Sequence, residues 1–153
     1  MKILFKISIL LFFLANIAKA DLIKPSSDLK PLDVLMIQLN SLKNNNNPYK
    51  DAGIAQSWEF AHPINKASTG PLENFTQMIY DDSYNILISH INNKVTTLKE
   101  SENQLVYKVY VLSKDKEKYY YIWQIEKIEK EGKLKDCWMT TSVSRPTYLG
   151  KII

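Results

Sequence analysis

The sequence is poor in the residues on which most metal and nucleotide motifs depend: it has one cysteine, two histidines and four glycines. With Cys137 alone, no disulfide can form within the chain. Two histidines supply no zinc-binding spacing, and no EF-hand loop occurs, so we expect no metal and no cofactor. The few glycines form neither a Walker loop nor a dinucleotide fingerprint, and no nucleophile elbow is present. These absences argue against the commonest metal-dependent and nucleotide-dependent enzymes.

A secretory signal peptide is predicted at residues 1–20. Lys2 and Lys6 precede an unbroken apolar run, ISILLFFLANI, and Ala18-Lys19-Ala20 forms a small-x-small cleavage site. The run is shorter than the roughly 20 residues that cross a bilayer; an uncleaved N-terminal anchor is the alternative. We therefore expect an exported protein, located in a periplasm, secreted or in an organelle lumen. We expect no stable membrane span after signal cleavage.

Removal of the signal nearly neutralises the chain. Lys2, Lys6 and Lys19 leave with it, so the 20 basic residues fall to 17 against 16 acidic ones, a net charge of +1. The lysines are scattered among glutamates and aspartates, as on a solvated surface. No basic field remains that would favour nucleic acid or an anionic membrane as a partner.

The first half of the mature chain predicts three helices after a polar leader at residues 21–30. Residues 31–42, PLDVLMIQLNSL, place leucines and Met36 on one helical face, and the asparagine run at 44–47 ends that helix. Pro48 opens a second helix, which must stop near Ala61 because the residue before Pro63 is pushed out of the α region. Gly70-Pro71 starts a third helix, with a stripe of Leu72, Phe75, Met78 and Ile79.

The second half predicts four or five antiparallel strands. Alternation at Tyr84, Ile86 and Ile88 indicates a strand, Asn92-Asn93 a turn, and residues 95–98 a short strand. Residues 104–113 and 119–128 are the clearest strands, joined by a charged hairpin loop. A last strand covers residues 133–144 and ends before Pro146, which leaves a C-terminal tail at residues 147–153.

Helices grouped before strands predict an α+β fold in one domain, residues 31–146, with three helices packed on one face of a curved antiparallel sheet.

The stretch from Phe60 to Tyr84 carries a family resemblance. Phe60-Ala61-x-Pro63 is followed by Gly70, Phe75, the apolar pair Met78-Ile79, and Tyr84. This pattern resembles the domain-of-unknown-function family numbered 4864. The resemblance implies a cystatin-like cone, as in nuclear transport factor two and ketosteroid isomerase, in which a curved sheet and three helices enclose a conical pocket. It implies no activity, because the family has none assigned and a fold does not determine function.

Aromatic side chains form the most informative set. Tyr119, Tyr121 and Trp123 share one face of a predicted strand. They are either a core packed on the helices or the wall of a ligand pocket, since tyrosine and tryptophan carry polar tips. The candidate pocket lining comprises Trp58, His62, Tyr84, Tyr107, Tyr121, Trp123 and Trp138.

The remaining reactive side chains each have a structural alternative. His62 follows the second predicted helix and would be a general base only with a partner such as Glu59; otherwise it caps a helix end or faces water. His90 lies at a predicted strand end. Cys137 is either a buried small hydrophobic residue or a reactive thiol. We therefore identify no catalytic residue.

Three functions are compatible with the sequence. The first is a non-catalytic binding or accessory module that holds a small apolar ligand or a protein partner in the cone. The second is a cone-fold enzyme, an isomerase, dehydratase or hydrolase, that uses a pocket carboxylate, histidine or tyrosine. The third is a scaffold that forms a homodimer through its sheet.

Overall fold

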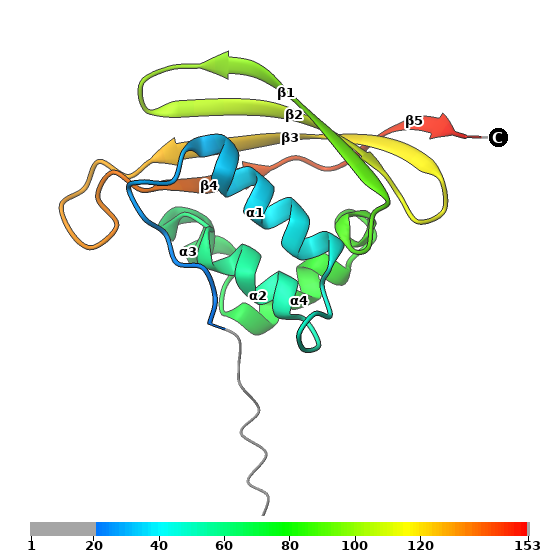
Figure 1. The fold of residues 1–153 in the computed structure, drawn as a ribbon, viewed down its shortest axis with the longest axis horizontal. Helices are drawn as coiled ribbons and strands as arrows, with labels where there is room; N and C mark the ends of the chain where they lie inside the picture. The colour runs from blue at the N-terminus through cyan, green and yellow to red at the C-terminus, as the bar shows by residue number, and fades with distance from the viewer. Residues whose placement is uncertain (1–20, 153) are drawn as a thin grey trace, which may run out of the picture.

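Helices occupy the first half of the domain and strands the second half. A computed structural model describes residues 21–152, in which four α-helices and a short 3₁₀ helix precede five β-strands. The helices all lie on one face of the antiparallel sheet (Figure 1). The predicted α+β class is confirmed, with four N-terminal helices in place of three.

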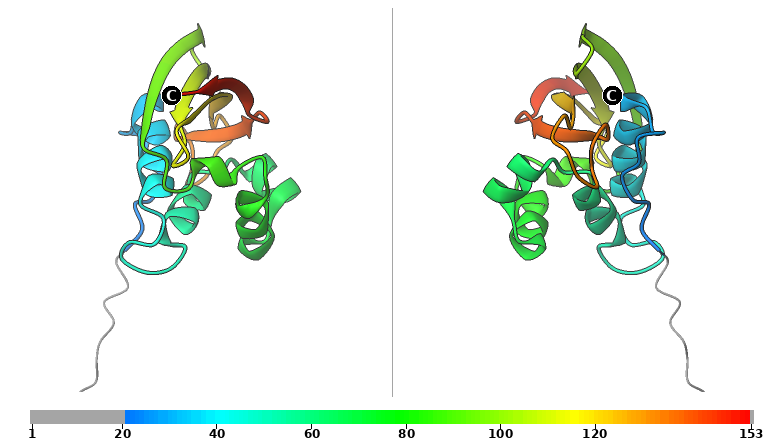
Figure 2. Two further views of the ribbon diagram at one scale, coloured as in Figure 1. Left: turned by 90° about the vertical axis from the view of Figure 1, so that its right-hand side faces the viewer. Right: turned by 90° about the vertical axis from the view of Figure 1, so that its left-hand side faces the viewer.

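The first two helices follow the predicted pattern. Helix α1, Pro31–Lys43, has Asp33 in its first turn, and the Asp33 carboxylate accepts a hydrogen bond from the Lys30 N–H at 2.9 Å. Helix α2, Ala52–Glu59, packs on α1, and its Gly53 donates its N–H to the carbonyl of Asn45, just after the end of α1, at 2.9 Å. In Figure 2, α1 (blue to cyan) and α4 (green) lie on opposite sides below the sheet, with α2 between them.

An additional helix begins at Pro63. Helix α3, Pro63–Thr69, occupies residues that the sequence predicts to be a connection. Proline is well suited to the first position of a helix, and His62 caps it, because its Nδ1 accepts the Ile64 N–H at 3.1 Å. Pro63 therefore ends one helix and begins the next. Helix α4, Leu72–Tyr80, has the predicted stripe, with Phe75 and Ile79 buried.

The strand predicted at residues 84–88 does not form. These residues make a turn and the 3₁₀ helix η1, Asn85–Leu87, in which the Leu87 N–H donates to the Tyr84 carbonyl at 3.0 Å. Only Leu87 is fully buried there, so the apparent alternation reflects partial burial around one anchor. Ser89, at φ 57°, then turns the chain toward the sheet.

The sheet runs in the order β1-β2-β3-β4. Its strands are β1, Asn92–Glu100; β2, Gln104–Leu112; β3, Glu117–Lys127; and β4, Trp138–Val143. The alternation predicted for β2 and β3 is confirmed, with Tyr107 of β2 opposite Trp123 of β3. Asn92 and Asn93, expected as a turn, already pair with β2. The last strand is expected to start at residue 133, but residues 133–136 form a turn and β4 begins at Trp138.

A fifth strand follows Pro146. Strand β5, Thr147–Lys151, pairs with the first half of β3, whereas β4 pairs with its second half. Pro146 thus separates two strands on the same side of β3, and the expected tail belongs to the sheet. Tyr148 packs on Tyr119 with ring centroids 5.3 Å apart.

The core lies between the helices and the inner face of the sheet. Leu35, Leu39, Phe60, Tyr121 and Ile125 are fully buried in it. The expected polar leader is attached to α2: the Ile23 N–H donates to Gln56 Oε1 at 2.7 Å. Among residues 21–152 no helix is long and apolar enough to cross a bilayer.

Candidate functional site

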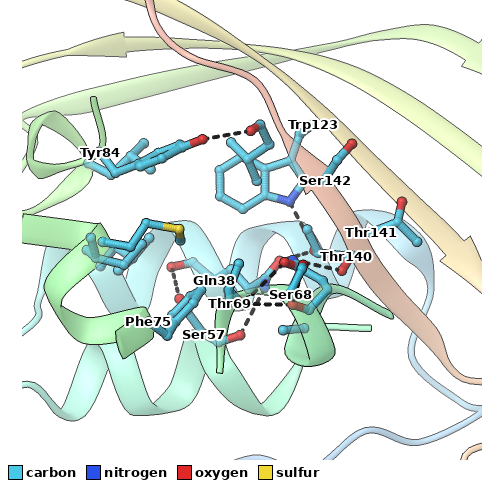
Figure 3. Close-up of a pocket in the computed structure, with 17 residues that line it drawn as sticks. Gln38, Ser57, Ser68, Thr69, Phe75, Tyr84, Trp123, Thr140, Thr141 and Ser142 are labelled. Atoms are coloured by element: carbon cyan, nitrogen blue, oxygen red, sulfur yellow. Dashed lines mark hydrogen bonds between the residues drawn. The ribbon is translucent and has the colours of Figure 1, made fainter. Parts of the chain in front are cut away.

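A cavity of about 260 Å³ opens between the helices and the β4 side of the sheet. It is bounded by α1, α2, α3, α4, η1, β3 and β4, and Figure 3 shows its side chains converging from these elements. The lining residues are Gln38, Leu42, Ser57, Ala61, Asn65, Ser68, Thr69, Phe75, Met78, Ile79, Tyr84, Leu87, Trp123, Thr140, Thr141, Ser142 and Val143.

The junction of α2 and α3 is fixed directly on β4. The Thr140 N–H donates to the Phe60 carbonyl, and the His62 N–H donates to the Thr140 carbonyl, both at 2.8 Å. Ala61 thereby forms a parallel bridge with Thr140. The sharp change of direction at Ala61-His62-Pro63 holds α3 against the end of the sheet, where it closes one side of the cavity.

A buried chain of hydrogen bonds forms one side of the cavity. The Trp123 indole N–H donates to Thr140 Oγ1 at 3.1 Å, and Thr140 Oγ1 donates to Gln38 Oε1 at 2.6 Å. The Gln38 amide in turn donates to the Ser57 carbonyl at 3.1 Å. No buried side-chain nitrogen or oxygen in residues 21–152 lacks a hydrogen-bond partner. The series of hydrogen bonds from Trp123 to Ser57 holds α1, α2, β3 and β4 in fixed positions relative to one another.

A β-bulge places an additional hydroxyl at the cavity. The register between β3 and β4 shifts because Ile125 pairs with Thr140 and Gln124 pairs with Ser142, which leaves Thr141 as the extra residue. Thr141 Oγ1 donates to the Gln124 carbonyl at 3.3 Å. Bulges redirect side chains beside functional sites, and here three consecutive hydroxyl residues line the cavity.

The lining carries no formal charge. Of its seventeen residues, Tyr84 is the only one with a titratable side chain. Burial raises the pKa of the Tyr84 phenol, with Arg145 opposing that rise, and its O–H donates to the Val143 carbonyl at 3.0 Å. Tyr84 is therefore a neutral phenol at physiological pH. Within the described part of the chain, no three metal-ligating side chains lie close enough together to hold a metal.

Two of the seven candidate residues line this cavity, Tyr84 and Trp123. Tyr121 lies directly behind Tyr84, with ring centroids 6.4 Å apart, and its O–H donates to the Ser83 carbonyl at 2.9 Å. Trp58 packs on the lining residue Phe75, with centroids 4.9 Å apart. Tyr121 and Trp58 thus support the cavity wall from outside.

The other three candidates lie away from the lining. Tyr107 is buried in the core on the inner face of β2. Trp138 begins β4, half-buried, with the Lys127 ammonium 5.1 Å from its ring. His62 caps α3, and burial lowers its pKa while Glu126 opposes that shift.

The expected partner of His62 and the single cysteine both make structural contacts. Glu59, the expected partner of His62, forms an ion pair with Lys24 at 2.9 Å. Cys137 is buried beside Ile128 and Met139, and burial raises the pKa of its thiol. A raised pKa keeps the sulfur protonated and weakly nucleophilic.

The polar lining was not identified from the sequence. Its members are Gln38, Ser57, Asn65, Ser68, Thr69, Thr140, Thr141 and Ser142. Two signals were available: Gln38 interrupts an apolar helical face, and TTS at 140–142 places three hydroxyls in a strand next to a tryptophan. A buried amide on an apolar face requires a partner, and here that partner is Thr140.

Comparison with known proteins yields no match: no family model, no curated protein and no solved structure matches the chain.

Proposed function

We infer that the protein is a non-catalytic module that binds a small molecule in the cavity between its helices and its sheet. The observation that carries this proposal is an open cavity of about 260 Å³ with aromatic, aliphatic, hydroxyl and amide side chains and no formal charge. Small-molecule sites are mostly apolar with a few placed polar groups, and the smallest have volumes of about 300 Å³. At about 260 Å³ the cavity lies just below that size, so it suits a ligand smaller than a drug-sized molecule.

The alternative, a cone-fold enzyme, receives no support from this lining. General acid–base catalysis needs a group whose protonation state can change near neutral pH. Tyr84 is the one titratable lining group, its pKa is raised by burial, and its proton is donated to the Val143 carbonyl. Nucleophilic catalysis by Ser142 or Thr141 would lack an adjacent base among the lining residues.

Two further expectations remain proposals. The apolar N-terminal run and its small-x-small site support export of the protein, and these residues lie outside those that the structure describes. The spacing from Phe60 to Tyr84 supports membership of domain-of-unknown-function family 4864 and its cystatin-like cone. The α+β arrangement is compatible with that fold.

A homodimer through the sheet also remains a proposal. The outer face of the sheet is opposite the helices and carries half-exposed Val106, Tyr110 and Ile122. Size-exclusion chromatography with light scattering distinguishes a monomer from a dimer directly.

A cavity-filling variant tests the binding proposal. Met78 lines the cavity from α4, whereas the next residue, Gln77, is exposed and lies outside the lining. Purified domain should gain thermal stability from members of a panel of small uncharged molecules. Met78→Trp should abolish that gain, and Gln77→Trp should retain it. Equal stabilisation of both variants, or no stabilisation of the wild type by any member, would contradict the proposal.

A further inference from the structure

Three hydroxyl groups on one side of the cavity donate their hydrogen atoms to main-chain carbonyls of the protein itself. Ser68 Oγ and Thr69 Oγ1 both donate to the Asn65 carbonyl, at 2.9 Å and 2.8 Å. Thr141 Oγ1 donates to the Gln124 carbonyl at 3.3 Å. A carbonyl cannot donate, and a hydroxyl has a single proton, so the direction of each bond is fixed.

These three hydroxyls therefore offer only lone pairs to a molecule in the cavity. The strongest donors of the lining are also engaged: the Trp123 N–H donates to Thr140 Oγ1, and the Tyr84 O–H donates to the Val143 carbonyl. The amide of Asn65 donates one hydrogen to the Thr140 carbonyl at 3.4 Å and keeps one. The Ser142 hydroxyl, which lines the cavity and is exposed, is a further donor, and acceptors still outnumber donors on the side formed by α3 and β4.

The opposite side of the cavity is apolar. Phe75, Met78 and Ile79 of α4 face it, together with Leu42 and Leu87. Figure 3 shows this division, with Ser68, Thr69, Thr141 and Ser142 grouped near β4 and Phe75 across the cavity from them. A ligand that fills the cavity meets hydrogen-bond acceptors at one end and hydrocarbon at the other.

A charged ligand would lack compensation in this cavity. No lining side chain carries a formal charge that could pair with a carboxylate or an ammonium group. Transfer of an unpaired charge from water into such a site is strongly unfavourable.

We propose that the ligand is an uncharged amphiphile with a hydrogen-bond donor, such as a hydroxyl group, at its polar end. That end lies against Ser68, Thr69 and Thr141, and the apolar body lies against α4. This inference rests on the proposed binding function and specifies the class of its ligand.

Three probes with the same ring test the proposal: para-cresol, its methyl ether and para-toluate. Near neutral pH these are an uncharged donor, an uncharged non-donor and an anion. Burial of apolar area alone would favour the ether, because it carries the additional methyl group. A donated hydrogen bond contributes about 1 kcal/mol, and burial of the additional methyl would return up to about 0.8 kcal/mol to the ether, so para-cresol should bind at least as tightly as the ether, and para-toluate should bind most weakly. Dissociation constants come from NMR titration of the folded protein.

Two matched variants test whether the preference for para-cresol over its methyl ether depends on a hydroxyl acceptor of α3. Thr69→Val removes a cavity acceptor with little change of shape. Thr76→Val is its control, since Thr76 on α4 makes the same bond to the carbonyl four residues earlier, to Leu72 at 2.8 Å, and lies outside the lining. Thr69→Val should lower the ratio of cresol to ether affinity by about threefold, and Thr76→Val should leave the ratio unchanged.

The outcomes separate the two proposals. If the ether binds more tightly than the cresol, if the toluate binds as tightly as the cresol, or if Thr69→Val keeps the full ratio of cresol to ether affinity, the ligand class is wrong while the binding function stands. If none of the three probes shifts resonances of lining residues, the binding function and the ligand class fail together.

Discussion

Thr140 connects four segments of the chain through its main-chain and side-chain atoms. It bonds to Phe60 and His62 through its main chain, and to Gln38 and Trp123 through its hydroxyl. The residue is only 2% exposed, so water cannot replace these partners. A single hydroxyl therefore determines how the helices meet the strand that forms the cavity.

Thr140→Val should lower the free energy of unfolding by about 2 to 4 kcal/mol, because it leaves the Trp123 indole N–H and the Gln38 side-chain Oε1 buried without partners. Thr140→Ser should recover most of the loss. Thr96→Val, at an exposed position of β1, should change stability by less than about 0.5 kcal/mol. Urea unfolding measures all three. A loss no larger for Thr140→Val than for Thr96→Val would refute the role of this hydroxyl.

His90 makes stability depend on pH. It is buried, with Nδ1 2.7 Å from the Leu87 carbonyl and Nε2 2.9 Å from the Asn93 amide nitrogen. The amide donates to Nε2, so Nδ1 carries the proton of a neutral ring. Burial lowers the pKa of His90; the bond to Leu87 opposes this shift and Lys43 adds to it.

With its pKa lowered in the folded state, His90 binds a proton more readily in the unfolded chain. The contribution of the neutral His90 ring to the free energy of unfolding is therefore complete above the ordinary histidine pKa of about 6.5. It is lost as the pH falls through the lowered pKa of the folded state. Urea unfolding at about pH 7.5 and about pH 5 should show a smaller decrease for His90→Gln than for the wild type. The lowered pKa of His62 also makes the folded state less stable at low pH. The same two measurements on His62→Gln therefore show how much of the decrease belongs to His62 and how much to His90. An equal decrease in wild type and His90→Gln would contradict this assignment.

At the scale of elements, the crossing of α1 and α2 depends on a glycine. A Cβ at Gly53 would overlap the Ser41 carbonyl and lie 2.8 Å from the Asn45 Cα. Asn45 is buried there, and its Oδ1 accepts the Ile54 N–H at 2.9 Å. The asparagine run thus contains a residue that fixes the start of α2.

Gly53→Ala should lower the free energy of unfolding by about 1 to 3 kcal/mol, because overpacking outweighs the intrinsic helix preference of alanine. Thermal unfolding followed by circular dichroism measures the change. An increase of the melting temperature, which helix preference alone predicts, would show that the two helices separate without cost.

The sequence predicts best those elements whose pattern is local. The stripe of α4 and the alternation of β2 and β3 follow from periodic burial, and both are confirmed. Tyr84, Ile86 and Ile88 alternate as a strand does, yet tertiary contacts made by Leu87 place them in a turn and a 3₁₀ helix. Strand β5 depends on pairing with β3, about 30 residues earlier in the chain, and its residues show no strong alternation.

The cavity itself depends on contacts that no local pattern reveals. Tyr84 and Trp123 were predicted as lining residues because each combines a large apolar ring with a polar tip, and both line the cavity. The polar side requires α3 to lie on β4 and Gln38 to reach Thr140, 102 residues away in the chain. Hydroxyl residues are common in loops and strands, so Ser68 and Thr141 stand out only after that arrangement is known.

At the scale of the whole molecule, the predicted export depends on residues outside those that the structure describes. Residues 1–20 should be removed during export, which leaves Asp21 as the first residue. Intact-mass measurement of the exported protein tests this directly. Ala20→Tyr should block cleavage, because the peptidase requires a small residue there. A wild-type protein that retains the apolar run and stays with the membrane would favour the uncleaved anchor.

The central claim is that the cavity between helices and sheet binds a small uncharged molecule. Titration of the isotope-labelled domain with para-cresol, followed through its methyl resonances, tests it most directly. The account predicts saturable shifts at the lining methyls of Met78, Ile79 and Val143, and none at Val106 or Ile122 on the outer sheet face. Shifts centred on the outer face, or none at the lining methyls at saturating probe, would contradict it.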